Sequence, residues 1–450
     1  MKRLSFVVAA LVTLVPLLGQ GAYASGRLAT RPHSQVKLIW FMRVFAQENL
    51  WEKQQIQAFE KLHPDITVQL ILAPNPNGQF DAKFNTLLNS TPADIWSHLG
   101  QAGFADYYHR NLLYDFTPLI KKYGYNWGHT PTNLINTYRK GSGLYGIPPA
   151  TLGSFLYYNK DIWDAYNKAH PSAKLAYPPV SWSDKSWTWA KMVDDATKLT
   201  NHAQRIYGIV ENLFPKPFSL AWLAGTDAFP PGSYKTGLPK SINLTQPAIV
   251  KIYQQMADWY NKSKIAPPYS DVDKTFSNSL DPFTTGKIAM ELTGGWGFRN
   301  YNNVSFHWAA AAMPYNATDK DVLFTDPYML YKNTKHPAEA FEFIKFLTSK
   351  PAMESYVREV TFTPSNPDYL GLWYKNVSAK TGLTQEQLQT LITGARAHGF
   401  ESPNHLIVNF SEIVNRMTQD TDPIFFGSKT AASQLQVTQT DINNIVQMTH

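Results

Sequence analysis

The feature that most constrains this chain is a repeated alternation of short apolar runs with amphipathic stretches. Residues 36–41 (VKLIWF) form an apolar run, which is typical of a strand buried on both faces. Residues 50–62 carry apolar side chains near helical spacing, and residues 66–70 alternate apolar and polar side chains as a strand does. A strand, a helix and a strand within about 35 residues predict a βαβ unit and a parallel sheet.

The same alternation continues along the chain and predicts an α/β fold class, with open sheets and helices on both faces. Helices are predicted over residues 80–90, 186–200, 249–263 and 336–350, and strands over residues 93–96, 287–292 and 307–314. In this fold class, ligands bind beyond the carboxyl ends of the strands. The first candidates for a binding site are therefore the segments that follow predicted strands, residues 40–43, 96–98 and 294–299.

Length and composition indicate a large globular protein without disulfides. The 450 residues favour two or three domains, and 44% hydrophobic against 17% charged residues supply a core. There is no cysteine, which excludes disulfides, thiol chemistry and a lipid-modified cysteine. The net charge of +7 is not gathered in a basic run, and no nucleic-acid-binding module is recognisable. Nucleic acid is therefore not an expected partner.

The N-terminus has the pattern of a secretory signal peptide. Lys2 and Arg3 precede an apolar run over residues 6–18, and residues 22–24 (AYA) match a small-x-small cleavage signal. The apolar run is too short to span a bilayer, so residues 1–24 are expected to be removed. Because no cysteine can carry a lipid anchor, we expect the mature protein to be soluble in the periplasm or outside the cell. We also expect it to be a monomer.

A secreted protein with 14% aromatic residues could be a carbohydrate-active hydrolytic enzyme, but the sequence offers no local motif for one. A glycosidase needs two carboxylates about 5 to 10 Å apart, and no motif links the candidates Asp81, Asp94, Glu211 and Asp326. The chain has no G-x-S-x-G elbow, no H-E-x-x-H helix and no phosphate-binding glycine fingerprint, and its 12 histidines are scattered. We therefore expect no catalytic residues, no metal and no cofactor.

Six stretches of the chain stand in an order that is typical of one family. They are FEKLHPDITVQL (59–70), FDAKFNTLLNSTPADIW (80–96), LYGIPPATLGSFLYYNKDIW (144–163), TWAKMVDDATKLT (188–200), FTTGKIAMELTGGWGF (283–298) and HPAEAFEFIKFLTSKPAMESYV (336–357). Together they resemble the extracellular solute-binding proteins of ABC importers, in the sugar-binding family that includes the maltose-binding protein. The resemblance implies a two-lobed fold, each lobe an open, mostly parallel sheet flanked by helices, which closes over a ligand and delivers it to a membrane permease.

The resemblance also implies where the chain passes between the lobes. Crossings are expected near residues 148–154, 307–314 and 361–364. Lobe 1 would then hold residues 36–150 and 315–360, and lobe 2 would hold residues 155–305 and 365–450.

A sugar ring offers a flat face of C–H groups to aromatic rings and a rim of hydroxyls to charged or amide groups. Trp296 is the first candidate platform, because the resemblance places it where the family often stacks a tryptophan on the sugar. The two glycines before it are expected to keep Cβ atoms out of the space of the sugar ring. The other candidate ligand-binding residues are Trp40, Arg43, Asp81, Trp96, His98, Phe218, Trp222, Gly295, Asp326 and Tyr328, whereas Asp94, Tyr158 and Asn159 are interpreted as structural.

One segment departs from the family pattern. Residues 149–156 (PATLGSFL) carry no charge where maltose-type members carry an acid, and Thr151 and Ser154 are the candidates to replace it. The predicted function is capture of an oligosaccharide or a related sugar between the lobes. The alternatives are a solute-binding protein for an acidic sugar, a glycerol phosphodiester or a polyamine, and a secreted carbohydrate-active enzyme.

Overall fold

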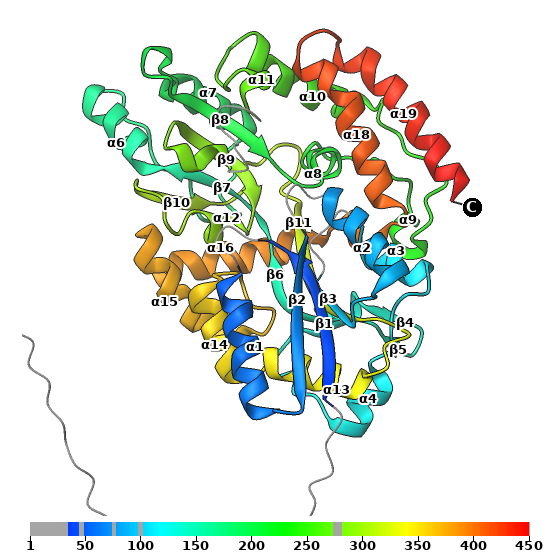
Figure 1. Ribbon diagram of the computed structural model, residues 1–450. Coiled ribbons are helices and arrows are strands. Elements are labelled where there is room, and N and C mark those ends of the chain that lie inside the picture. The colour runs from blue at the N-terminus through cyan, green and yellow to red at the C-terminus, as the bar shows by residue number, and fades with distance from the viewer. Residues whose placement is uncertain (1–34, 45–48, 74–77, 98–101, 273–280, 450) are drawn as a thin grey trace, which may run out of the picture. The chain divides into compact units, whose positions relative to one another are not determined.

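Two main β-sheets and a short two-stranded ribbon organise the chain (Figure 1). The computed structural model describes residues 35–44, 49–73, 78–97, 102–272 and 281–449. The predicted signal peptide over residues 1–24 and the candidate residue His98 lie outside these ranges. No helix within these ranges has both the length and the apolar character needed to cross a bilayer.

The first sheet has the order β12-β11-β3-β1-β2, and β6 also pairs with β11. Its strands are β1 (Val36–Arg43), β2 (Ile66–Ala73), β3 (Ile95–Ser97), β6 (Ile147–Leu152), β11 (Asp321–Leu330) and β12 (Gly399–Glu401). β1 pairs in parallel with both β2 and β3, which confirms the predicted βαβ unit. β11 runs antiparallel to β3 and β6 and parallel to β12, so the sheet is mixed.

The second sheet has the order β10-β7-β9-β8. Its strands are β7 (Ser154–Asn159), β8 (Tyr207–Asn212), β9 (Ile288–Gly294) and β10 (Trp308–Ala311), and the separate ribbon joins β4 (Arg139–Lys140) to β5 (Gly143–Leu144). In this sheet β8 and β9 pair in parallel, whereas β7 runs antiparallel to both β9 and β10. The α/β fold class is confirmed, with antiparallel pairs more numerous in this sheet than the sequence suggested.

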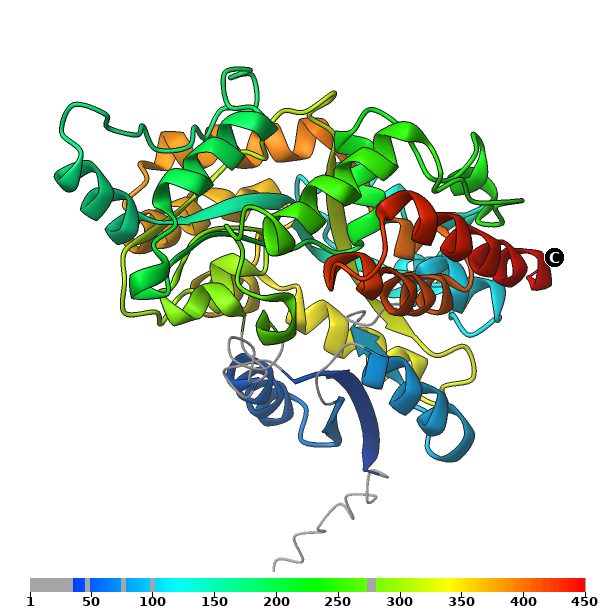
Figure 2. The ribbon, with the colours of Figure 1, turned by 90° about the horizontal axis from the view of Figure 1, so that it is seen from above.

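Helices follow most of the strands. They are α1 (Leu50–Leu62), α2 (Gly78–Ser90), α3 (Phe104–His109), α4 (Thr117–Tyr123), α5 (Thr132–Asn136), α6 (Lys160–Ala169), α7 (Trp189–Leu199), α8 (Lys216–Leu223), α9 (Ser233–Thr236), α10 (Pro247–Asn261), α11 (Tyr269–Val272), α12 (Gly297–Asn300), α13 (Pro337–Leu347), α14 (Lys350–Glu359), α15 (Leu370–Thr381), α16 (Gln385–His398), α17 (Pro403–Leu406), α18 (Phe410–Phe425) and α19 (Ala431–Met448), with 3-10 turns η1 (His202–Gln204), η2 (Pro282–Thr285) and η3 (Pro367–Tyr369). The two longest, α18 and α19, pack side by side in both views (Figures 1 and 2).

Side chains of β1 alternate between two hydrophobic clusters on opposite faces of the first sheet, as the two-residue period of a strand requires. Leu38 and Trp40 belong to the cluster that also holds Phe59 of α1, whereas Ile39 and Phe41 belong to the cluster that holds Phe80 of α2. Helices therefore cover both faces, which explains why β1 reads as a nearly continuous apolar run.

Two residues interpreted as structural are confirmed in that role. The Asp94 carboxylate accepts a hydrogen bond from the Ile39 amide at 2.8 Å and another from the Thr334 hydroxyl at 2.5 Å, and so fixes the approach to β3. The Asn159 side chain accepts hydrogen bonds from the amides of Asp161 and Ile162 and so caps the N-terminus of α6.

The chain passes from the first sheet to the second at Gly153, which stands between β6 and β7. A Cβ atom at this position would lie 2.9 Å from the Cβ of Ala395, so only glycine fits without a shift. The Gly153 carbonyl accepts a hydrogen bond from the Gly295 amide at 2.7 Å. The Asp321 carboxylate accepts one from the Ser154 amide at 2.8 Å.

A second segment runs alongside this crossing. The Thr151 amide donates to the Thr363 carbonyl at 3.0 Å, the Ser365 amide donates to the Pro149 carbonyl at 2.9 Å, and the Thr151 and Ser365 hydroxyls are 2.8 Å apart. Thr151 and Ser154 are both buried. The Thr151 hydroxyl bonds to the neighbouring crossing segment and the Ser154 amide bonds to the Asp321 carboxylate, and the expectation that these two residues replace a ligand-binding acid stays a prediction.

Asp321 makes the crossing sensitive to pH. Burial raises the pKa of Asp321 from its ordinary value of 3.8 to about 7, and the hydrogen bonds from the Ser154 and Val322 amides oppose that rise. Between these two values the native state holds a proton that the unfolded chain has released. The free energy of unfolding therefore falls as pH rises through this window.

We predict that Asp321→Asn gains stability relative to wild type as pH increases, because asparagine still accepts the Ser154 amide and cannot ionise. Urea unfolding of both proteins at about pH 5 and about pH 8 measures this difference. The stability difference should shift in favour of the variant at the higher pH. An equal difference at both pH values would contradict a raised pKa of Asp321.

Candidate functional site

Trp40, in the second half of β1, is one of several predicted site residues that meet where the first sheet faces α12. Its indole ring is buried, packs edge-on against Tyr328 and Phe343 at centroid distances of 6.1 and 5.5 Å, and donates a hydrogen bond from Nε1 to the Ser97 hydroxyl at 3.1 Å. The candidates Asp326 and Tyr328 lie inside β11. Strand β11 therefore carries two candidates to the end of β1.

Arg43 is the last residue of β1 and shares an electrostatic environment with Asp326 and Arg299. Burial lowers the pKa of Arg43 to about 10, the nearby Asp326 carboxylate opposes this, and the Arg299 guanidinium adds to it. Two cations and an acid from three elements therefore lie near one another.

Glu52 of α1 supplies the second acid of this group. Burial raises the pKa of Glu52, and the Arg299 guanidinium is the largest influence in the opposite direction. Burial likewise lowers the pKa of Arg299, and Glu52 opposes the change. The Arg299 guanidinium also lies 5.6 Å from the centre of the Phe362 ring, in cation–π geometry. Arg299 lies in α12, which follows β9 of the second sheet, and Glu52 lies in α1, which follows β1 of the first sheet. This charge interaction therefore joins the two halves of the protein, each half being one sheet with its helices.

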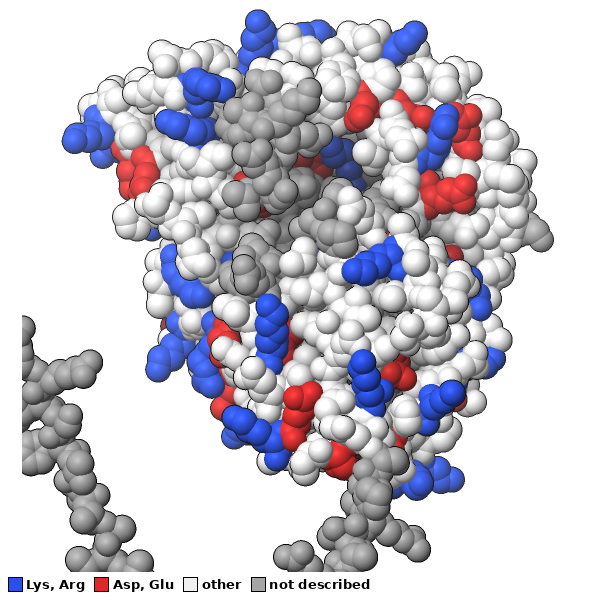
Figure 3. Space-filling view, viewed as in Figure 1, with Lys and Arg blue, Asp and Glu red and all other residues white. Residues whose placement is uncertain are grey.

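We use the name strand-end site for seven residues: Trp40, Arg43, Glu52, Trp296, Arg299, Asp326 and Tyr328. Five of them, Trp40, Glu52, Arg299, Asp326 and Tyr328, line one cavity of about 40 Å³, together with Trp51, Ser97 and Tyr356. This volume holds water but no sugar ring. The space-filling view shows a larger hollow between the two halves, with acidic and basic side chains interspersed over the face (Figure 3).

Trp296 lies two residues beyond the end of β9, as the sequence predicted for the segment after this strand, and it immediately precedes α12. Its ring is partly buried and packs edge-on against Phe324 at a centroid distance of 5.2 Å. A Cβ atom on Gly294 would lie 2.2 Å from Cζ3 of this ring. The expectation that the preceding glycine makes room for a sugar is therefore wrong, because Gly294 makes room for the indole of Trp296 itself. Gly295 contributes its amide to the Gly153 carbonyl.

Three other aromatic candidates lie in hydrophobic packing away from the strand-end site. Trp96 belongs to the opposite face of the first sheet, where it packs against Phe84 and Tyr107. Phe218 is buried between Phe229 and Phe410. Trp222 is buried beside Tyr234 and donates from Nε1 to Asp227 at 2.9 Å. The structure gives these three side chains packing partners and brings none of them to Trp40 or Trp296.

Asp81 of α2 is held apart from the strand-end site. Its carboxylate accepts hydrogen bonds from the Ala102 amide at 3.2 Å and from the Ser411 hydroxyl at 2.8 Å. It therefore links α2 to α18, a contact between segments 330 residues apart.

Sequence reasoning missed two aromatic residues that extend the Trp296 surface. Phe324 of β11 lies between Trp296 and Phe214, and the Phe214 and Phe324 rings stack at 6.2 Å. Phe214 precedes α8, whereas the sequence pointed to Phe218 and Trp222 within that helix. Its position directly after strand β8 was the available signal, because the loop that follows a strand is where ligands bind in this fold class.

Nothing in the strand-end site is arranged as a metal centre. Within the described ranges, no three histidine or acidic side chains converge closely enough to hold a metal ion.

Comparison with known proteins defines the class. The family described as "Bacterial extracellular solute-binding protein" matches residues 45–354. A protein of Brucella abortus that is named as a binding protein is 22% identical over 325 residues, which cover 69% of this chain and 72% of that protein.

Solved structures share the fold. An ABC substrate-binding protein from Listeria monocytogenes, in complex with cycloalternan, has a TM-score of 0.77 at 18% identity and covers 92% of this chain and 99% of its own. Maltose-bound MalE3 of T. maritima has a TM-score of 0.72 at 17% identity, covering 91% and 100%. The GacH receptor of Streptomyces glaucescens, solved with acarbose, has a TM-score of 0.70 at 17% identity, covering 92% and 99%.

The two sheets, with helices on their faces and a site where strand ends meet, define a two-lobed periplasmic-binding-protein fold. Because the family match spans more than half of its length, this chain belongs to the bacterial extracellular solute-binding proteins.

We predict measurable coupling between Glu52 and Arg299, because each charge is buried and offsets the other. Glu52→Gln and Arg299→Met should each destabilise the protein, and the double variant should lose less than the sum. A double-mutant cycle of urea unfolding should give a coupling free energy on the order of 1–3 kcal/mol. Additive losses would mean that this charge interaction does not join the two halves.

Proposed function

We propose that the protein captures a carbohydrate between its two sheets and hands it to the permease of an ABC importer. The observation that carries the proposal is Trp296, a partly buried indole that adjoins Phe324 and stands one turn from Arg299. An aromatic face beside charged hydrogen-bonding groups is the combination that sugar rings require. Solved relatives with this fold carry cycloalternan, maltose, mannotriose and acarbose, which supports the same ligand class here.

In this proposal Arg43 and Asp326 hydrogen-bond the sugar hydroxyls, and Trp296 stacks on the ring. Trp40 and Tyr328 hold the floor of the site rather than the ligand, because both are buried and pack against each other. Gly295 positions Trp296 through its bond to the crossing at Gly153. Trp96, Phe218 and Trp222 then have packing roles, and Asp81 joins α2 to α18.

The lobes are proposed to follow the two sheets. Lobe 1 comprises residues 36–150 and 315–360, and lobe 2 comprises residues 155–305 and 365–450, with crossings near 148–154, 307–314 and 361–364. The pairing of β12 with β11 adds residues 399–401 to the sheet of lobe 1. Closure of the lobes would exclude water and strengthen each hydrogen bond to the ligand.

We further propose that the protein acts in the periplasm or outside the cell after removal of residues 1–24, works as a monomer and catalyses no reaction. A polyamine needs carboxylates to bind its ammonium groups. This ligand class is disfavoured, because the carboxylates of Asp326 and Glu52 already lie near the cationic side chains of Arg43 and Arg299. An acidic sugar would instead use the arginines, and is the alternative that a ligand screen should include.

The function is tested by a thermal-shift screen of the purified mature protein with neutral oligosaccharides, uronates and polyamines. A neutral oligosaccharide should raise the melting temperature, because a ligand that binds only the native state stabilises it by mass action. Chromatography of the same mixtures should show the sugar unchanged. Turnover of the sugar would overturn the binding function in favour of an enzyme, and a response to uronates alone would replace the ligand class.

We predict that Trp296→Ala weakens the binding of the responding sugar by about 1–3 kcal/mol, a factor of about 5 to about 150 in Kd, because the stacking face is lost. Trp296→Phe should recover part of the loss. Titration calorimetry measures both. Trp96→Phe is the matched control, since it removes a buried indole on the opposite face of the first sheet and should change stability without changing Kd. An unchanged Kd in Trp296→Ala would reassign Trp296 to packing.

A further inference from the structure

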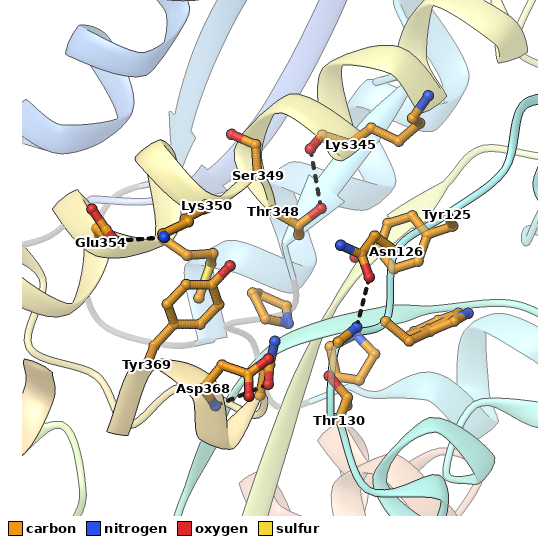
Figure 4. Close-up of a pocket in the computed structure, with 16 residues that line it drawn as sticks. Tyr125, Asn126, Thr130, Lys345, Thr348, Ser349, Lys350, Glu354, Asp368 and Tyr369 are labelled. Carbon is orange, nitrogen blue, oxygen red and sulfur yellow. Dashed lines mark hydrogen bonds and ion pairs between the residues drawn. The ribbon is translucent and has the colours of Figure 1, made fainter. Parts of the chain in front are cut away.

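A second pocket lies outside the strand-end site, beside the crossing segments (Figure 4). We call it the crossing-side pocket. Its cavity volume is about 670 Å³, within the range of small-molecule sites. Its walls come from the loop after α4, the start of β6, the turn between α13 and α14, and η3. Pro149 lines both this pocket and the small cavity of the strand-end site, so a single strand separates the two spaces.

Aromatic rings supply a corner in this pocket. Tyr125 and Trp127 meet edge to face with centroids 4.4 Å apart, and both are only partly buried. Tyr369 of η3 faces them across the pocket, as Figure 4 shows for the labelled Tyr125 and Tyr369. Two aromatic surfaces at an angle, with a third opposite, can bury the apolar face of a flat ring.

Hydroxyl and amide groups surround these rings. Asn126, Thr130, Ser349 and Asn366 line the pocket, and Figure 4 shows Asn126 and Ser349 on different walls. Within the described part of the chain, the Ser349 and Thr130 hydroxyls make no hydrogen bond to another protein group. The Ser349 and Thr130 hydroxyls can therefore bind sugar hydroxyls, and the side-chain amides of Asn126 and Asn366, whose oxygens accept backbone hydrogen bonds, add NH donors to this polar rim.

The charged groups of the pocket are already paired. Lys350 lies 3.9 Å from Glu354, Asp368 lies 2.5 Å from His129, and Lys345 lies 3.2 Å from Glu342. In Figure 4 the ammonium group of Lys345 points away from the pocket. An anionic or cationic ligand would have to displace one of these pairs, whereas a neutral ligand would not.

We propose that the crossing-side pocket is a second binding site, for a neutral sugar of one or two rings. The site goes beyond the proposed function, because it lies apart from Trp296 and Arg43.

The position of the pocket links its occupancy to movement of the crossings. The Asn366 side chain accepts the His129 amide at 3.3 Å, and a Cβ on Gly128 would lie 2.3 Å from Asn366 Nδ2, so the loop after α4 fits closely against η3. Within the crossing itself, the Ser365 amide donates a hydrogen bond to the Pro149 carbonyl. A sugar that contacts both η3 and Pro149 binds tightly to only one arrangement of these segments. Because Pro149 also lines the cavity of the strand-end site, binding in the crossing-side pocket then changes the affinity of the strand-end site. This coupling rests on the proposed function, and it is reciprocal.

The test uses the mature protein carrying Trp296→Ala, which removes the proposed stacking face of the strand-end site. Maltose and mannobiose are added at millimolar concentrations, and hydrogen–deuterium exchange is followed by mass spectrometry. Peptides that contain residues 125–130 and 366–369 should be protected by at least one sugar. Galacturonate, as a charged comparator, should protect them less.

Two further variants keep the test decisive. Trp127→Ala, added to Trp296→Ala, should raise the sugar concentration that gives half-maximal protection by about tenfold. Ser349→Phe should block the pocket without breaking a side-chain hydrogen bond, and so provides a second test if the tryptophan variant misfolds. Absence of protection by both sugars, or protection that survives Ser349→Phe, would overturn the second site. Failure of the proposed function would appear separately, as no binding at the strand-end site of the wild type.

Discussion

The hydrogen bonds around Gly153 fix the point where the chain passes from the first sheet to the second. One residue separates a strand of the first sheet from a strand of the second, and its carbonyl receives the Gly295 amide at 2.7 Å. The Ser154 amide is received by Asp321, the first residue of β11. The crossing is therefore bonded to the turn that carries Trp296 and to the strand that carries Asp326. Relative movement of the sheets would therefore strain these bonds.

This arrangement explains why residues from distant parts of the sequence share one site. Strand β11 brings Asp326 to Arg43 at the end of β1, and β9 delivers Trp296 and Arg299 from the second sheet. The charges of Arg299 and Glu52 then face each other from the two halves. Buried charges tolerate little misplacement, since an unmatched one is costly. The same residues that hold the halves together thus flank the surface proposed to hold the ligand.

The sequence was sufficient for the α/β class, for helix α1 and for the position of Trp296 after β9, because each rests on a local period or a glycine signal. It was insufficient for side-chain direction. Trp40 and Trp96 both lie inside strands of the first sheet, yet their side chains belong to opposite faces, and the register that decides this is a tertiary property. The role of Gly294 could not be predicted from the glycine alone, because the Trp296 indole occupies the space that a Cβ atom on Gly294 would take. Glu52 and Arg299 are 247 positions apart, and no local pattern pairs them.

A carbohydrate held between the two sheets against Trp296 should be visible in a crystal structure of the mature protein with the oligosaccharide that gives the largest thermal shift. We expect density for a sugar ring stacked on Trp296, with hydroxyls within hydrogen-bond distance of Arg43 or Asp326. A sugar bound elsewhere, with Trp296 packed only against Phe324 and away from the ligand, would contradict it.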